Sequence, residues 1–213
     1  QVVWARYLGH LVLMAVLLWP KYGTGLFRAN RPGMQIGRSL LLLVDTILFF
    51  TGLTLVGLAE ATAIFFTVPM LVVVLSVPLL GERIGLRRAM GVLAGLTGAL
   101  IIVRPGLGEV PVTALYFIAA ACTNALYQLT TRMLREHDDA YTTLFYTGLV
   151  GAVLSSFAVP AVWVAPTPIE WALMAGMGTF GALGHFTLIR AFQSAPPSAL
   201  MPFAYSGLVW ATL

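Results

Sequence analysis

The chain has 213 residues, of which 59% are hydrophobic and 9% are charged, and its mean hydropathy is +0.91. A soluble globular protein carries about 25% charged residues, so this composition excludes a soluble surface and intrinsic disorder, and predicts an all-α integral membrane protein. The net charge of +4 is spread along the chain instead of forming a basic patch, which argues against nucleic-acid binding, and the single cysteine, Cys122, excludes a disulfide framework and a multi-cysteine metal site.

Eight apolar segments follow one another along the chain. A helix needs about 20 apolar residues to cross about 30 Å of hydrocarbon. By that measure seven segments are full length and the last is cut short, and they cover the ranges 2–20, 36–57, 59–80, 86–104, 111–131, 141–163, 168–190 and 198–213. Their short connections predict antiparallel neighbours. Because the chain starts at Gln1 and stops at Leu213 inside an apolar run, we expect an internal fragment of a longer protein.

Basic residues divide unevenly between the two ends of these segments. Two of the twelve, Arg6 and Arg104, fall on one side, and the other ten fall in alternate loops on the opposite side. Cytoplasmic loops are enriched in Lys and Arg. We therefore expect a multi-pass protein of the plasma (inner) membrane, with cytoplasmic loops near Arg28, Arg87, Arg135 and Arg190.

The sequence also contains a weak internal repeat. Segments 1–20 and 141–160 align without gaps and both end in proline, and 49–66 aligns with 186–203 in the same order. The loop charges place 1–20 and 141–160 in opposite directions across the membrane. Inverted repeats with a binding site at their interface are typical of transporters.

Several motifs in the stretch 58–106 are specific enough to compare with a family. They are a small-residue helix start, a proline within a span, a Gly81-Glu82-Arg83 turn, and a glycine-rich helix that ends at Arg104-Pro105-Gly106. This stretch resembles the EamA branch of the drug/metabolite transporter superfamily, as do 125–134 and 185–211 in the second half. The resemblance covers essentially the whole chain.

The resemblance implies ten helices in two inverted repeats of five. Residues 1–104 are then the first repeat without its first helix, and 105–213 are the second repeat without its last. The expected architecture is a bundle of about eight transmembrane helices. The resemblance also implies transport of small organic metabolites, and it carries almost no information about the substrate.

Asp45 lies near the middle of segment 36–57. A carboxylate at a helix centre costs about 2.5–3.5 kcal/mol to insert, so it should face protein or water. The helical period places Arg38, Phe49 and Gly52 on the same face, which we expect to point inward. Asp45 either binds a proton or a cationic substrate, or is the structural partner of a histidine or arginine. EamA proteins usually have a small or apolar residue here.

Four further polar groups share one face of segment 111–131: Asn124, Tyr127, Gln128 and Thr131. Facing lipid they would be costly, so we expect them to line a cavity or to form hydrogen bonds between helices.

Three further sets of residues each allow two roles or one structural role. His185 is a site residue or a packing residue. Phe66 and Tyr205 occupy comparable places in the two repeats, and either stack on a substrate ring or pack in the core. Arg6 and His10 are expected to anchor the outer interface.

Other features predict structure more than chemistry. Gly91 and Gly95 form a GxxxG pair, which predicts close helix packing. Glu82, beside three arginines, predicts an internal ion network at a cytoplasmic turn. Three prolines are each expected to remove a backbone hydrogen bond within a span, either as static kinks or along a cavity: Pro69, Pro78 and Pro202.

Together these features predict a secondary transporter of small organic metabolites, an exporter or exchanger that works by alternating access. Its substrate site is predicted at Asp45, Phe66, Asn124, Tyr127, Gln128, His185 and Tyr205. Motifs for hydrolases, metalloproteases and phosphate loops are absent from the sequence, so we expect no enzyme, no metal and no cofactor. The expected partners are a metabolite and the lipid bilayer, not nucleic acid, while proton coupling through Asp45 or His185 and a homodimer stay open.

Two other functions compete with this interpretation. The first is an intramembrane enzyme that uses Asp45 and His185 as acid and base. The second is a membrane scaffold with no substrate, in which the polar faces satisfy one another. Turnover in detergent favours an enzyme, and gradient-driven uptake into sealed vesicles favours a transporter.

Overall fold

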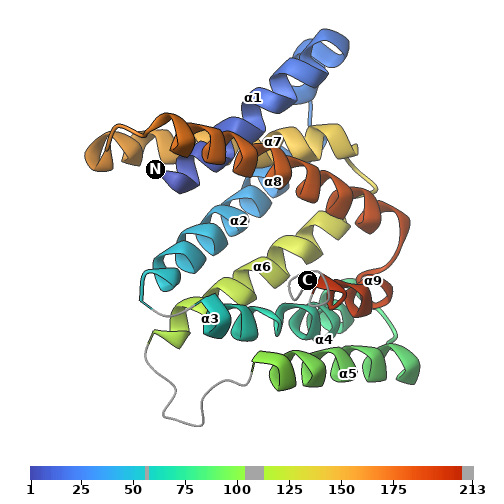
Figure 1. Ribbon diagram of the computed structural model, residues 1–213. Helices are drawn as coiled ribbons and strands as arrows, with labels where there is room; N and C mark the ends of the chain where they lie inside the picture. The colour runs from blue at the N-terminus through green and yellow to red at the C-terminus, as the bar shows by residue number, and fades with distance from the viewer. Residues whose placement is uncertain (56–57, 104–112, 208–213) are drawn as a thin grey trace. The chain divides into compact units, whose positions relative to one another are not determined.

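The computed structural model describes residues 1–55, 58–103 and 113–207, and the regular structure in these ranges is entirely helical (Figure 1). This confirms the all-α class, and each of the eight predicted segments contains helix. The elements in chain order are α1 (Val2–Tyr22), the 3-10 helix η1 (Gly23–Phe27), α2 (Pro32–Leu53), α3 (Leu58–Phe65), α4 (Val68–Leu80), α5 (Leu86–Val103), α6 (Ala114–Leu134), α7 (Ala140–Ala158), the 3-10 helix η2 (Val159–Val162), α8 (Pro168–Ser194) and α9 (Pro197–Ala204).

Local sequence signals set the helix ends. α7 begins after Asp139, whose Oδ1 accepts a hydrogen bond from the backbone N–H of Thr142 at 2.7 Å. α8 begins with a capping box: Glu170 N–H donates to the Thr167 hydroxyl at 3.3 Å, and Thr167 N–H donates to Glu170 Oε2 at 2.7 Å. Gly81 ends α4 with φ of 67°, a left-handed conformation that glycine adopts at no steric cost.

The predicted segment 59–80 is divided into two helices. α3 ends at Phe65, and α4 begins at Val68 after Thr67. Pro69 therefore lies in the first turn of α4, where a backbone N–H has no partner within the helix. The prediction that Pro69 removes a backbone hydrogen bond within a continuous span is therefore wrong. Pro78 and Pro202 lie inside α4 and α9, as expected.

Four helical segments among the described residues are long and apolar enough to cross a membrane: Val2–Phe27, Pro32–Leu53, Ala140–Val162 and Pro168–Ser194. α4 is apolar but has only 13 residues, because the break after α3 shortens it. Large apolar side chains cover the outer faces of the long helices; Phe157 and Phe180 are 81% and 75% exposed. Apolar surface of this kind is favourable only where lipid or another protein covers it.

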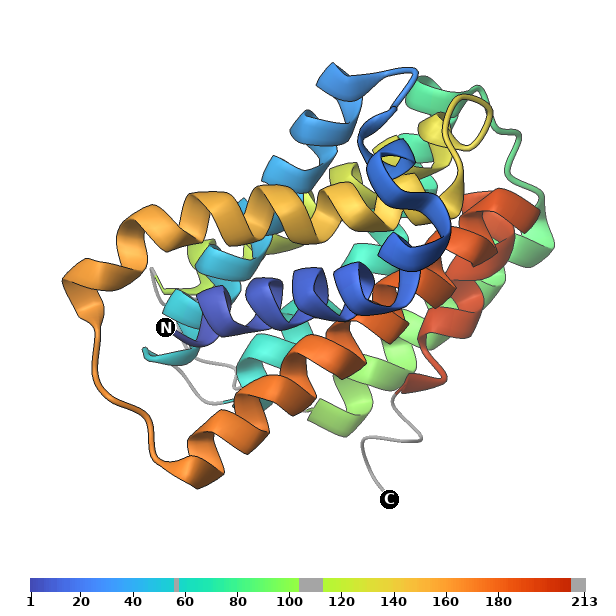
Figure 2. The ribbon, with the colours of Figure 1, turned by 90° about the horizontal axis from the view of Figure 1, so that it is seen from above.

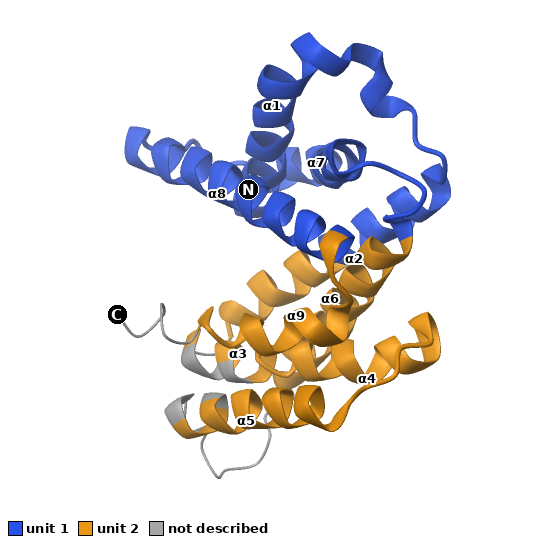
Figure 3. Cartoon of the chain, turned by 90° about the vertical axis from the view of Figure 1, so that its right-hand side faces the viewer, with its two compact units in different colours: residues 1–43, 134–193 blue, residues 44–133, 194–213 orange. Residues whose placement is uncertain are grey.

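The chain divides into two compact units (Figure 3). Unit 1 consists of residues 1–43 and 134–193, and so contains α1, η1, the first half of α2, α7, η2 and α8. Unit 2 consists of residues 44–133 and 194–213, and contains the second half of α2, α3 to α6, and α9. Each unit combines residues from both predicted repeats.

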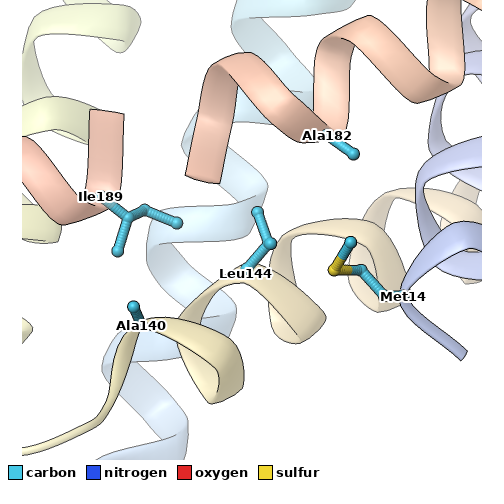
Figure 4. Close-up of a cluster of buried hydrophobic side chains, with 5 residues drawn as sticks. All are labelled: Met14, Ala140, Leu144, Ala182 and Ile189. Atoms are coloured by element: carbon cyan, nitrogen blue, oxygen red, sulfur yellow. The ribbon is translucent and has the colours of Figure 1, made fainter. Parts of the chain in front are cut away.

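The core of unit 1 forms where three helices meet. Met14 of α1, Leu144 of α7 and Ile189 of α8 are buried together with two alanines, Ala140 and Ala182 (Figure 4). Figure 2 shows α1 running between α7 and α8. Burying this apolar cluster fixes α1 against both neighbours.

Glycines bring α1 unusually close to α7 and α8. A Cβ added to Gly178 of α8 would lie 2.7 Å from the Cα of Gly9, so the two backbones touch at this point. A Cβ added to Gly151 of α7 would overlap the ring of Tyr7, which is 1% exposed. Small residues allow this kind of close helix packing in membranes.

Unit 2 shows the packing that the GxxxG pair predicts. A Cβ added to Gly95 of α5 would overlap the ring of Tyr205, and one added to Gly91 would lie 3.4 Å from the Cβ of Pro202. Both partners come from α9 or the residue that follows it. The predicted close helix approach at Gly91 and Gly95 is therefore confirmed.

Aromatic rings connect α2, α3 and α6 in the same unit. The ring centroid of Phe49 on α2 lies 5.0 Å from that of Phe65 and 5.6 Å from that of Phe117. A Cβ added to Gly52 would lie 2.5 Å from Cζ of Phe117, so this glycine makes room for the ring. The C-terminal half of α2 is thus held by edge-to-face aromatic contacts.

Candidate functional site

α2 carries its polar residues on a buried face. Arg38 and Asp45 are 1% and 5% exposed, and Gly52 is also buried, as the helical period predicts. The opposite face presents apolar side chains that are all more than a third exposed: Ile36, Leu40, Val44 and Ile47. A helix with this pattern directs its ionisable groups away from lipid.

Asp45 begins a chain of hydrogen bonds in unit 2. Its Oδ2 accepts a bond from Asn124 Nδ2 at 2.9 Å, and Asn124 Oδ1 accepts one from Gln128 Nε2 at 2.8 Å. We call these three residues the carboxylate–amide chain. The Oε1 atom of Gln128 is buried and has no hydrogen-bond partner among the described residues. The carboxylate–amide chain therefore ends in a side-chain carbonyl oxygen that is able to accept a further hydrogen bond.

The remaining polar residues of that face of α6 have structural contacts. Thr131 donates its hydroxyl hydrogen to the Tyr127 carbonyl at 2.7 Å, within the same helix. Tyr127 is 1% exposed. The bond between Asn124 and Asp45 shows interhelical bonding, one of the two expected roles, while the lining of a cavity stays a prediction.

Phe66 and Tyr205 contact each other. Their rings stack at 6.1 Å between centroids with an interplanar angle of 23°. The Tyr205 hydroxyl also donates a hydrogen bond to the Phe66 carbonyl at 3.1 Å, just where α3 gives way to α4. The two rings thus have a packing role, and their role toward a substrate stays a prediction.

His185 lies in unit 1 among other basic groups. Arg6 Nη2 donates to His185 Nε2 at 3.0 Å, and the rings of His10 and His185 stack at 6.2 Å between centroids. Arg38 Nη1 donates to the Thr147 hydroxyl at 3.1 Å and Arg38 Nη2 to the Thr143 carbonyl at 3.4 Å, on the part of α7 whose Leu144 carbonyl bonds to His10. The predicted anchoring of His10 at the interface is wrong, because His10 is 2% exposed and its ring stacks on His185. Arg6 also contacts His185, and its anchoring stays a prediction.

A second buried network in unit 1 was not predicted. Asp138, in the turn before α7, accepts hydrogen bonds from the Asn30 backbone N–H at 2.6 Å and from Gln35 Nε2 at 3.0 Å. Gln35 also donates to the Thr143 hydroxyl at 3.0 Å. The available signal was the spacing of Gln35, which lies one turn before Arg38 on the buried face of α2.

Glu82 has different partners from those predicted. Its Oε2 accepts a hydrogen bond from the Ser198 backbone N–H at 3.2 Å, at the start of α9. Arg88 Nη1 donates to the Ser198 hydroxyl at 3.0 Å. The expected ion network is thus replaced by a bridge through a serine, because the unpaired N–H groups of a helix start attract the carboxylate.

The described residues contain no group of three or more His, Cys, Asp or Glu side chains that is placed to hold a metal ion.

The structure brings some of the seven predicted site residues together. It connects Asp45, Asn124 and Gln128 by hydrogen bonds and pairs Phe66 with Tyr205. Tyr127 is buried and belongs to the same unit, and His185 belongs to the other unit.

Comparisons with known proteins agree with this architecture. Residues 1–104 match the model of the EamA-like transporter family. The S-adenosylmethionine uptake transporter of Rickettsia bellii is 30% identical over 203 residues, which cover 95% of this chain and 69% of that protein. The pseudopaline exporter CntI of Pseudomonas aeruginosa is 28% identical over 203 residues, which cover 93% of this chain and 70% of that protein. The riboflavin transporter of Vibrio cholerae is 27% identical over 150 residues, 70% of this chain and 50% of that one.

A solved crystal structure has the same fold. It superposes with a TM-score of 0.78 at 22% identity, over 96% of this chain and 74% of that one. The helical architecture, the apolar spans and the similarity to named transporters agree with one another. The chain belongs to the EamA-like transporter family and is a multi-pass membrane transporter of small metabolites.

Proposed function

We propose that the chain exports or exchanges a small organic metabolite by alternating access between two inverted repeats, residues 1–104 and 105–213. The named relatives include an uptake transporter and an exporter, so direction varies among similar proteins. We place the loops near Arg28, Arg87, Arg135 and Arg190 in the cytoplasm and the protein in the plasma (inner) membrane. Proton coupling and a homodimer belong to the same proposal.

The observation that carries the proposal is the carboxylate–amide chain of unit 2. Asp45 is 5% exposed on a helix apolar enough to span a membrane, where a carboxylate is costly. Asn124 fixes one of its oxygens, and Gln128 fixes Asn124. The side chains are thereby held in one orientation before a ligand arrives, which lowers the entropic cost of binding.

The chemistry of these groups selects a substrate end that donates hydrogen bonds. A carboxylate accepts only, and the buried Oε1 of Gln128 is a further acceptor. A protonated amine or another cationic N–H group satisfies both. In our proposal Asp45, Asn124 and Gln128 hold this end, the Phe66–Tyr205 pair packs beside the apolar part, and Tyr127 and His185 are the remaining predicted contacts.

An intramembrane enzyme is the second candidate, with Asp45 and His185 as acid and base. We favour transport because the compared relatives are named transporters.

Metabolite profiling tests the proposal and does not require the substrate to be identified first. Cells that overexpress the full-length protein are compared with a deletion strain and with cells that express Asp45→Asn. Glu136→Gln is the matched control, because Glu136 is also a carboxylate but is 69% exposed and paired with Arg135. We expect a change in one metabolite class that Asp45→Asn abolishes and Glu136→Gln preserves. Identical profiles in the deletion and overexpressing cells would contradict the proposal.

A further inference from the structure

The connection between α1 and α2 is anchored to α7. Gly23, with φ of 49°, ends α1 and lets the chain turn into η1. Leu26 of η1 is 1% exposed and packs in a buried cluster with Phe145 and Tyr146 of α7. The Tyr146 hydroxyl also donates a hydrogen bond to the Phe27 carbonyl at 3.0 Å. The backbone of η1 is therefore held in one position against α7.

Two large aromatic rings of this connection are half-exposed. Trp19, near the end of α1, is 46% exposed, and Phe27, at the end of η1, is 47% exposed. The rings meet edge to face, with 6.3 Å between their centroids. Both belong to the segment Val2–Phe27, which is apolar enough to cross a membrane. Tryptophan is enriched where the hydrocarbon of a bilayer gives way to headgroups, so we assign these rings to that level.

Three cations flank the two rings. Lys21 precedes η1, and Arg28 and Arg31 follow it. All three are exposed, and none forms an ion pair within the described residues; the Lys21 ammonium lies 5.3 Å from the centroid of the Tyr22 ring. Arg28 and Arg31 are three residues apart, so their Cα atoms are separated by at most about 11 Å, and their long side chains can reach one anion together. We call Trp19, Lys21, Phe27, Arg28 and Arg31 the η1 edge.

The carboxylates of the adjoining turn, between α6 and α7, are engaged elsewhere. Asn30 joins this turn to the η1 edge, because its backbone N–H donates to Asp138 at 2.6 Å. Asp138 is 6% exposed and Asp139 caps the start of α7. Glu136 pairs with Arg135 at 2.7 Å. None of these carboxylates forms an ion pair with a cation of the η1 edge, which therefore remains able to bind an anion.

The other end of α7 provides an internal comparison. Trp163 and Trp171 are 47% and 44% exposed, and their rings lie 6.3 Å apart between centroids. Half-exposed aromatic rings thus occur at this end too. The sequence contains no Lys or Arg between Arg135 and Arg190, so these rings have no cation beside them in sequence. The combination of rings with cations distinguishes the η1 edge from an ordinary aromatic belt.

We infer that the η1 edge binds the headgroup of an anionic phospholipid. Arg28 and Arg31 donate charge-assisted hydrogen bonds to the phosphate oxygens, Lys21 adds positive charge, and the Trp19–Phe27 pair packs against the start of the acyl chains. A phospholipid joins an anion to apolar chains, just as the η1 edge joins cations to apolar rings at the end of a membrane span. An acidic peptide would match the cations but would leave the rings without apolar cover.

Brominated phospholipids test the site, because bromine quenches the fluorescence of a tryptophan that it contacts. Full-length protein is placed in phosphatidylcholine nanodiscs that contain a small share of brominated phosphatidylglycerol or, as the zwitterionic match, brominated phosphatidylcholine. The signal of Trp19 is the difference between each protein and its Trp19→Phe counterpart, which keeps a ring at this half-exposed position. Trp171→Phe gives the signal of the comparison site in the same way. The ratio of the two lipid affinities is the preference for the anionic lipid.

We expect a preference of about tenfold or more at Trp19 and none at Trp171. A surface cation contributes about fivefold to the binding of anionic lipid, so Arg28→Gln and Arg31→Gln should each lower the preference by about fivefold. Arg87→Gln, which removes an exposed arginine of unit 2, should leave it unchanged.

Three results would overturn the inference: no preference at Trp19, an equal preference at Trp171, or an unchanged preference when Arg28 and Arg31 are both replaced by glutamine. If inorganic phosphate at constant ionic strength abolished the preference, the site would bind free phosphate instead of a lipid. The measurement requires neither a cargo nor a defined orientation in the disc. Its failure would therefore leave the proposed transport function standing, and failure of that function would leave the lipid site standing.

Discussion

Replacing Gly151 by alanine tests the closest contact between α1 and α7. The new Cβ would lie 2.6 Å from Cε1 of Tyr7 and nearer still to other atoms of the ring, and Tyr7 is 1% exposed and has no open space beside it. Overpacking of this kind costs about 1–3 kcal/mol. The same substitution gains about 1 kcal/mol in helix propensity, so a control must remove that gain.

Gly176→Ala is the matched control, because it lies within α8 and a Cβ there meets nothing within 4 Å. We expect Gly151→Ala to be less stable than Gly176→Ala by about 1–3 kcal/mol, since the propensity gain is common to both. The free energy of unfolding is measured by SDS titration in mixed micelles, followed by tryptophan fluorescence. Tyr7→Ala is itself destabilising, but in a double-mutant cycle it should remove the extra cost of Gly151→Ala, so the two changes should be coupled. Equal stability of the two glycine variants, together with zero coupling to Tyr7, would refute the packing argument.

Three further predictions address orientation and local contacts. A reporter fused near Arg87 should be cytoplasmic and one near Thr167 exterior; the opposite labelling would refute the orientation, and labelling of both positions on one side would refute the repeat inversion. Asp138→Ala should lower the free energy of unfolding by about 3 kcal/mol, because it removes two hydrogen bonds to a buried carboxylate, whereas Glu136→Ala should change it by less than about 0.5 kcal/mol. Tyr205→Phe should cost about 0.5–1.5 kcal/mol through loss of the bond to the Phe66 carbonyl; an unchanged unfolding midpoint would contradict that bond.

Helix positions and buried faces could be predicted because they depend on local periodicity. The inward face of α2 follows from the spacing of Arg38, Asp45 and Gly52, and the close contact at Gly95 follows from the GxxxG pattern. The break between α3 and α4 could not be predicted. A run of apolar residues gives no signal for an interruption other than Pro69, and a proline is compatible with both a kink and a helix start.

The partners of buried polar residues could not be predicted from one sequence. Periodicity indicates which face is buried but not which helix lies opposite, so the bond from Asn124 to Asp45 could not be predicted. The same reason explains the wrong interface prediction for His10 and the unforeseen bond of Arg6, because basic and aromatic residues near a helix end fit an anchor equally well. Their contact with His185 depends on the approach of α1 to α8 at Gly9 and Gly178.

The central claim is that Asp45 and its amide partners bind the transported metabolite. Once profiling has identified the cargo, full-length protein is reconstituted into sealed vesicles, and the rate of cargo exchange is measured across the pH range for wild type, Asp45→Asn and Glu136→Gln. We predict that Asp45→Asn lowers the rate by about tenfold or more, as expected for the loss of a hydrogen bond to a charged group, with normal membrane insertion, and that Glu136→Gln matches wild type. Wild-type exchange by Asp45→Asn at every pH would contradict the account.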